Sequence, residues 1–261
     1  MQRSPLHTYV HLPATTSARV DALLALHPIK TRQAVDAMLD RLVCLDLSRD
    51  VRQVHEFETA DGGWFVTVFD VTRLHGITDV SHVHEKNVQH HRWQEITVSE
   101  ALGVVSVVES ELEATDSALQ QASQCHFLTS IGAGVAKEHN TVTFTEFSAA
   151  STRLAGPHSV FVLDFVDEDD QSPYRPHERL REDVTAVNFA VNASSLDFLS
   201  SSANSSSSLG SSEVLFARLG FIRLHRSQCG TSPAMMQRAR DIIVPWGRAV
   251  LADIKERLGV A

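Results

Sequence analysis

Hydrophobic and polar residues alternate through most of the middle of this chain, which is typical of strands with one buried face. Residues 51–59 and 64–71 are rich in Val, Phe, Thr and Trp, and a glycine-containing loop, residues 60–63, joins them. This arrangement predicts a β-hairpin. Residues 159–166 predict a strong strand that is apolar on both sides. The same pattern predicts further strands over residues 6–12, 92–98, 102–111, 141–147, 184–191 and 214–224.

Between residues 15 and 43 the apolar positions recur every three to four residues, which is the period of an amphipathic helix. A first helix around Leu23 is expected to end at His27, because the residue before a proline disfavours the helical conformation. Thr31 is the predicted N-cap of a second helix. The apolar stripe of this second helix comprises Val35, Met38, Leu39, Leu42 and Val43.

The end of the chain predicts one long helix. Ser232 is a suitable N-cap, Pro233 suits the first helical position, and Gly259 is a suitable stop. Pro245 lies inside the helix, where it removes one backbone donor and favours a kink. The stripe that must be buried comprises Met235, Ala239, Ile242, Ile243, Trp246, Val250, Ile254 and Leu258.

These elements predict an α+β fold in a single domain, residues 1–261. A curved, mostly antiparallel sheet is expected, with two N-terminal helices and a long C-terminal helix packed across it, because a helix with an apolar stripe must cover a sheet. Eleven of the nineteen residues between 194 and 212 are serine. Such a segment buries almost nothing, so we expect a flexible insertion between two strands.

The order of elements resembles the helix-grip superfamily, which includes START-type lipid-transfer domains. The resemblance covers nearly the whole chain and rests on no diagnostic motif. It implies an apolar cavity between the sheet and the terminal helix. A second, local resemblance concerns residues 125–167, which contain the run Gly-Ala-Gly-Val-Ala-Lys at 132–137 and the strand at 159–166. This segment is similar to the Ran-binding Mog1/PsbP-like family, but the N-terminal third of the chain does not match it.

A cavity under the terminal helix makes part of its stripe a candidate binding surface. Met and Trp suit irregular apolar cavities, and Pro245 is placed to bend the helix over one. One side of the strand at 159–166 then forms the opposite wall. The predicted cavity residues are Phe161, Leu163, Phe165, Met235, Ile242, Ile243, Trp246 and Val250.

Histidines gather between residues 75 and 91. If His82 and His84 lay on a strand, both rings would face the same side, a spacing that can bind zinc or copper. The predicted metal ligands are His82, His84, His90 and His91, against the alternative that these are exposed imidazoles of a polar connection. The four acidic residues at 167–170 are expected to form a solvated turn.

The composition and the absence of certain motifs argue against several classes of function. The formal net charge of −9 argues against a nucleic-acid-binding protein, which needs a basic face. No apolar run reaches the length of a membrane-spanning helix. The Ser130–Gly134 region completes neither a serine-nucleophile motif nor a dinucleotide-binding motif, since Leu128 and Lys137 stand where glycines are required. We therefore predict no catalytic residues and no cofactor.

The first hypothesis is a non-enzymatic protein that binds an apolar small molecule or lipid. An interaction or scaffold subunit of a larger complex is the alternative, in which a protein is the partner. The third is an enzyme that uses the histidines of residues 75–91. The expected location is the cytoplasm. The acid-free first twenty residues, with Arg3 and Arg19, leave a mitochondrial transit peptide as the alternative.

Overall fold

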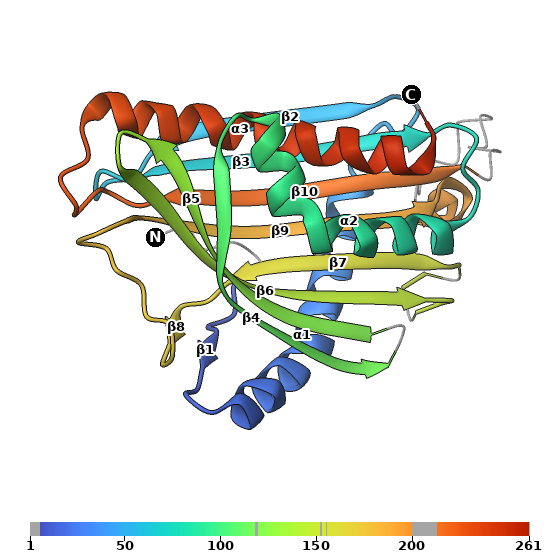
Figure 1. Ribbon diagram of the computed structural model, residues 1–261. Coiled ribbons are helices and arrows are strands. Elements are labelled where there is room, and N and C mark those ends of the chain that lie inside the picture. The colour runs from blue at the N-terminus through green and yellow to red at the C-terminus, as the bar shows by residue number, and fades with distance from the viewer. Residues whose placement is uncertain (1–5, 118–119, 152, 155, 200–212, 261) are drawn as a thin grey trace.

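The fold is described from a computed structural model that covers residues 6–117, 120–151, 153–154, 156–199 and 213–260 (Figure 1). None of the helices in these ranges is both long and apolar enough to cross a membrane. The elements, in chain order, are β1 (His11–Leu12), α1 (Thr16–Leu42), β2 (Val51–Glu58), β3 (Trp64–Leu74), α2 (Val80–Ala101), β4 (Val105–Ser117), β5 (Gln120–Gly132), β6 (Val135–Ser148), β7 (His158–Phe165), β8 (Glu168–Asp169), β9 (Leu180–Asn192), the 3-10 helix η1 (Ala193–Leu199), β10 (Val214–Leu224) and α3 (Pro233–Leu258).

One curved sheet dominates the molecule, with the strand order β2-β3-β10-β9-β7-β6-β5-β4. Neighbouring strands in this order run antiparallel, and β6 and β9 also share a short parallel pairing. The predicted hairpin at residues 51–71 is β2 and β3. Strands β1 and β8 form a separate short parallel pair. The predicted fold class, a mostly antiparallel sheet with a long C-terminal helix across it, is confirmed.

Helices cover both faces of the sheet (Figure 1). On one face α1 packs over Val160 and Val162 of β7, within an apolar cluster that also contains Met38 and Phe144. On the other face α2 and α3 pack against two further apolar clusters. Both sides of β7 are therefore buried, which explains why its sequence is an almost continuous apolar run.

The prediction of two N-terminal helices is wrong, because α1 is one continuous helix with Pro28 inside it. Pro28 lies on the exposed side of α1, so the Leu24 carbonyl that loses its donor faces water. Buried residues on the same helix face, from Leu23 to Met38, hold the two halves in line. Thr31 is not an N-cap; its hydroxyl donates to the His27 carbonyl oxygen at 3.1 Å within the helix.

The strand predicted at residues 92–98 is also wrong, because these residues belong to α2. Asp79 caps this helix by accepting a hydrogen bond from the Ser81 amide at 2.8 Å. The buried side of α2 includes polar residues, which hides its helical period from a hydropathy pattern. Among the side chains of α2 that the structure describes, the buried ones are Val80, Val83, His84, Asn87, His90, Val98 and Ser99.

The acidic run at 167–170 and the serine-rich segment at 194–212 are both predicted to be loops. The acidic run at 167–170 is only partly a solvated turn, because Asp169 is buried and forms an ion pair with Arg19 at 2.7 Å. Within the predicted insertion at 194–212, the first residues belong to η1. Residues 200–212, on which the prediction of flexibility mainly rests, lie outside the described residues.

Candidate functional site

Small residues make a hollow in the middle of the sheet on the side of α3. Gly220 of β10 pairs in register with Val68 of β3 and with Ala186 of β9. Ala186 in turn pairs with Leu163 of β7. In this row across four strands, the two central positions carry little or no side chain. The space between the backbone of the sheet and the helix is therefore not filled by side chains at these two positions, as it is where large side chains stand.

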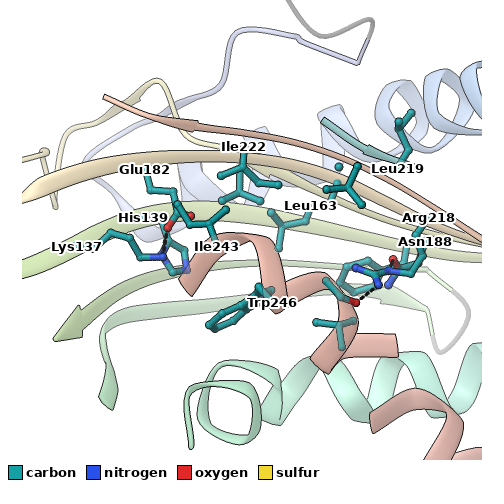
Figure 2. Close-up of a pocket in the computed structure, with 17 residues that line it drawn as sticks. Lys137, His139, Leu163, Glu182, Asn188, Arg218, Leu219, Ile222, Ile243 and Trp246 are labelled. Carbon is teal, nitrogen blue, oxygen red and sulfur yellow. Dashed lines mark hydrogen bonds and ion pairs between the residues drawn. The ribbon is translucent and has the colours of Figure 1, made fainter. Parts of the chain in front are cut away.

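Helix α3 forms the roof over this hollow. The helix is capped as predicted, with Ser232 at its N-terminus and Gly259 in the left-handed conformation at its C-terminus. Pro245 lies within it, four residues after the exposed Asp241, whose carbonyl loses its helical donor. Ile243, Trp246 and Val250 of α3 line the space between the helix and the sheet, and Figure 2 shows Ile243 and Trp246 there.

A cavity of about 90 Å³ lies between the row of small residues and α3. That volume has room for several waters or for part of a small organic ligand. Most of its wall is apolar, and charged side chains stand at two separate ends (Figure 2). Its lining residues are Val68, Lys137, His139, Phe161, Leu163, Glu182, Val184, Ala186, Asn188, Arg218, Leu219, Gly220, Ile222, Ile243, Trp246, Gly247 and Val250.

One polar end of the cavity is internally balanced. Lys137 of β6 and Glu182 of β9 are both buried and form an ion pair. His139 lies beside them, with its Nδ1 3.8 Å from the Glu182 carboxylate. The Lys137 ammonium also lies 5.8 Å from the centre of the Trp246 ring. This end therefore carries no net charge when His139 is neutral.

The other polar end is built around Arg218 of β10. Its Nε donates to Asn188 Oδ1 at 3.3 Å, and its Nη1 donates to the Gly247 carbonyl oxygen of α3. Asn188 is held in turn by Asn87 of α2 at 3.1 Å. Burial lowers the pKa of Arg218 to about 10, so the guanidinium is still protonated at neutral pH. This end therefore carries a positive charge.

The fold is similar to those of several solved structures. The structure is similar to that of a STAR-related lipid transfer protein (fragment 25–204) from Xanthomonas axonopodis, with a TM-score of 0.38 and 12% sequence identity. The likeness covers 78% of this chain and 98% of that chain. No protein-family model and no curated protein matches the sequence. Neither the helix-grip nor the Mog1/PsbP-like resemblance is thus supported by a family model.

The predicted cavity residues divide into two groups. Five of the eight line the cavity: Phe161, Leu163, Ile243, Trp246 and Val250. The other three lie elsewhere. The Phe165 ring stacks on His7 at 5.4 Å, and Met235 and Ile242 pack in the apolar cluster around Trp64. A ligand-binding role for the five lining residues stays a prediction.

The sequence analysis missed the charged and polar residues of the cavity. Arg218 interrupts a strand that is otherwise largely apolar, within Val-Leu-Phe-Ala-Arg-Leu-Gly, whereas Lys137 and Glu182 lie in polar stretches of their strands. A charge in the middle of a strand buried on both faces was the available signal, since such a residue must find a partner or a cavity. The missed residues are Lys137, His139, Glu182, Asn188 and Arg218.

The four predicted histidine ligands do not converge on one point in the part of the chain that the structure describes. His82 and His84 lie on α2 rather than on a strand, so a spacing of two residues does not bring their rings to one face. His84 shares a hydrogen bond with Ser159 Oγ at 2.9 Å, and His91 packs edge-on against Phe161. His90 bonds to Asp253 of α3. Within the described ranges, no group of three or more His, Cys, Asp or Glu side chains is placed to hold a metal ion.

Proposed function

We propose that this chain is a binding protein that holds an apolar small molecule or lipid in the cavity between the sheet and α3. The observation that carries the proposal is a cavity whose wall is mostly apolar and whose floor is kept low by Gly220 and Ala186. Ligand sites in proteins are typically concave, mostly apolar and equipped with a few placed polar groups. The cavity of this chain has the same character.

The two other hypotheses receive less support. A scaffold subunit needs no cavity, and a filled core would stabilise it better. An enzyme that uses the histidines of residues 75–91 needs them to converge. Instead, His84 bonds to Ser159 and His90 bonds to Asp253, and both side chains pack between elements of the fold.

The test fills the cavity without disturbing its walls. A Cβ added at Gly220 would meet only ordinary contacts, 3.5 Å from Ile222 Cδ1 and 4.0 Å from Val68 Cβ. The G220V variant is therefore expected to fold and to place its methyl groups in the cavity. Binding is measured with N-phenyl-1-naphthylamine, a neutral apolar dye that fluoresces in apolar sites. We expect wild-type protein to bind the dye and G220V to bind it at least about tenfold more weakly, as expected when an occupying side chain replaces ligand contacts.

The control is A252V, which also introduces a valine, at an exposed position of α3. This variant should bind the dye like wild type. Equal dye binding by wild type and G220V would contradict the proposal. Absence of dye binding by the wild type, together with a bare protein mass in native mass spectrometry, would also overturn it and would favour the scaffold hypothesis.

A further inference from the structure

The positive charges near the cavity are not all balanced by the protein. Lys137 is paired with Glu182. Arg52 is paired with Asp70 at 3.0 Å, and Asp70 is the residue directly opposite Arg218 on β3. Within the part of the chain that the structure describes, no carboxylate forms an ion pair with Arg218 itself. The Asp70 carboxylate thus lies near two guanidinium groups, those of Arg52 and Arg218, and it balances only one of them. The hydrogen-bond partners of Arg218 itself, at the wall of a mostly apolar cavity, are neutral.

The guanidinium of Arg218 is fixed in orientation. Its Nε and Nη1 groups donate to Asn188 and Gly247, which lie on β9 and α3. Its Nη2 group has no hydrogen-bond acceptor among the described residues, and the side chain keeps accessible surface because it lines the cavity. Gly247 allows this close approach to the helix, since a Cβ at that position would lie 3.2 Å from Nη2.

Such a group is expected to have an anionic partner. A buried charge without a counter-charge is costly, and a planar guanidinium matches the oxygens of a carboxylate or of a phosphate. We propose that Arg218 anchors the carboxylate of the molecule held in this cavity, and that the ligand is a small apolar monocarboxylic acid. This inference rests on the proposed function and names the ligand class for the same cavity.

The other lining residues suit a ligand that has one negatively charged group and an otherwise apolar structure. Phe161 and Val250 line the same cavity as Arg218. Leu163 and Ile243 lie between its two polar ends (Figure 2). The second polar end is already neutral through Lys137 and Glu182. A single guanidinium balances a carboxylate but leaves a dianionic phosphate ester with an unpaired charge. The walls therefore favour an acid with a short aliphatic or aromatic tail.

The experiment compares ligands that differ only in the head group. The affinities of hexanoate, hexanol and methyl hexanoate are measured by their displacement of the neutral dye N-phenyl-1-naphthylamine. The measurement is made on wild-type protein and on R218M at neutral pH. We expect wild type to bind hexanoate about ten to a hundredfold more tightly than hexanol, the range of a hydrogen bond to a charged group. R218M should bind the acid and the alcohol equally and should keep the affinity of wild type for the alcohol.

Two control variants separate an anchor from a structural residue. R223M removes an arginine of the same strand that does not line the cavity, and it should keep the preference for the acid. R218K keeps the charge but loses the planar fork, and it should retain part of the preference. R218M removes two hydrogen bonds together with a buried charge that no carboxylate pairs with directly, and these effects partly offset each other, so we expect only a small change in melting temperature. A large drop in melting temperature would point to a structural role and contradict the anchor.

A carbon-13 label on the hexanoate carboxyl gives a readout that packing alone would not change. Next to Arg218 the bound acid should stay ionised at pH values where free hexanoate is already protonated. An unchanged acid preference in R218M would overturn the anchor while leaving the cavity proposal intact. Failure of the dye and of all three ligands to bind wild type would overturn both proposals together.

Discussion

Asp169 is a buried carboxylate that stabilises the fold through an ion pair with the buried Arg19. Burial raises the pKa of Asp169, but hydrogen bonds from Arg19, from the Ser172 amide and from Asn140 outweigh burial and lower it to about 2. Because the pKa in the folded state lies below the ordinary value of 3.8, this carboxylate stabilises the fold above about pH 4. That contribution, about 2 kcal/mol, is lost as the pH falls from about 4 to about 2.

Replacing this carboxylate should be strongly destabilising. In D169N the Arg19 guanidinium, whose side chain is 3% exposed, loses its counter-charge. We expect a loss of about 3–5 kcal/mol in the free energy of unfolding, measured by urea denaturation at pH 7. The neighbouring D170N is the matched control, since Asp170 is about half exposed and should change stability by less than about 1 kcal/mol. Equal effects of the two variants would contradict this account.

Among the elements, α1 and α2 differ most from what the sequence predicts, and each has a local reason. Pro28 indicated a break in α1, but it sits on the solvent side, where water replaces the lost backbone bond. The strand assigned to residues 92–98 failed because α2 buries histidine and asparagine on its inner side. By contrast α3, with a strong cap at each end and an apolar stripe, is predicted almost to the residue.

The continuity of α1 can be tested at Pro28. Alanine there restores an amide donor for the Leu24 carbonyl and removes the helix penalty of proline. We expect P28A to raise the free energy of unfolding by roughly 1–3 kcal/mol, measured by urea denaturation. If residues 27–28 were instead a true boundary between two helices, the same change would leave stability unaltered or lower it.

The buried histidines at the inner side of α2 make this packing sensitive to acid. Burial lowers the pKa of His84 and of His90 below the usual 6.5, although Asp253 partly opposes this at His90. Burial also lowers the pKa of His158, the residue before Ser159, to which His84 is hydrogen-bonded. The folded state therefore binds these protons less readily than the unfolded state. The stability that comes from neutral histidines is complete above about pH 6.5 and declines as the pH falls below it.

We expect the free energy of unfolding to decrease from pH 7.5 to pH 5.5 in urea titrations. In H84Q one buried ionisable group is replaced by a neutral one that still offers a hydrogen bond to Ser159, so the decrease should be smaller. The control is H75Q, at a position where the side chain is 77% exposed. This variant should keep the pH dependence of wild type. A steeper loss in H84Q would contradict the expected sign.

For the molecule as a whole, the sequence predicts the sheet and the covering C-terminal helix, but not the chemistry of the cavity. The nearly continuous apolar run identifies β7 as a buried strand, and Phe161 and Leu163 on one of its sides line the cavity. The register that sets Gly220 beside Ala186 is a long-range property, since it depends on how β9 and β10 pair. The meeting of Arg218 with Gly247 depends further on where α3 crosses the sheet. Local patterns carry neither kind of information.

The sheet has a buried region on each of its faces, and successive residues of β7 point alternately into one and the other. Val160 and Val162 belong to the interior under α1, while Phe161 and Leu163 belong to the one under α3. Changes at the odd positions alter the shape of the cavity, and changes at the even positions alter the packing under α1. Selection can therefore act on the two sets separately. A descendant of this protein can reshape its cavity through one side of a strand while the other side still specifies the same fold.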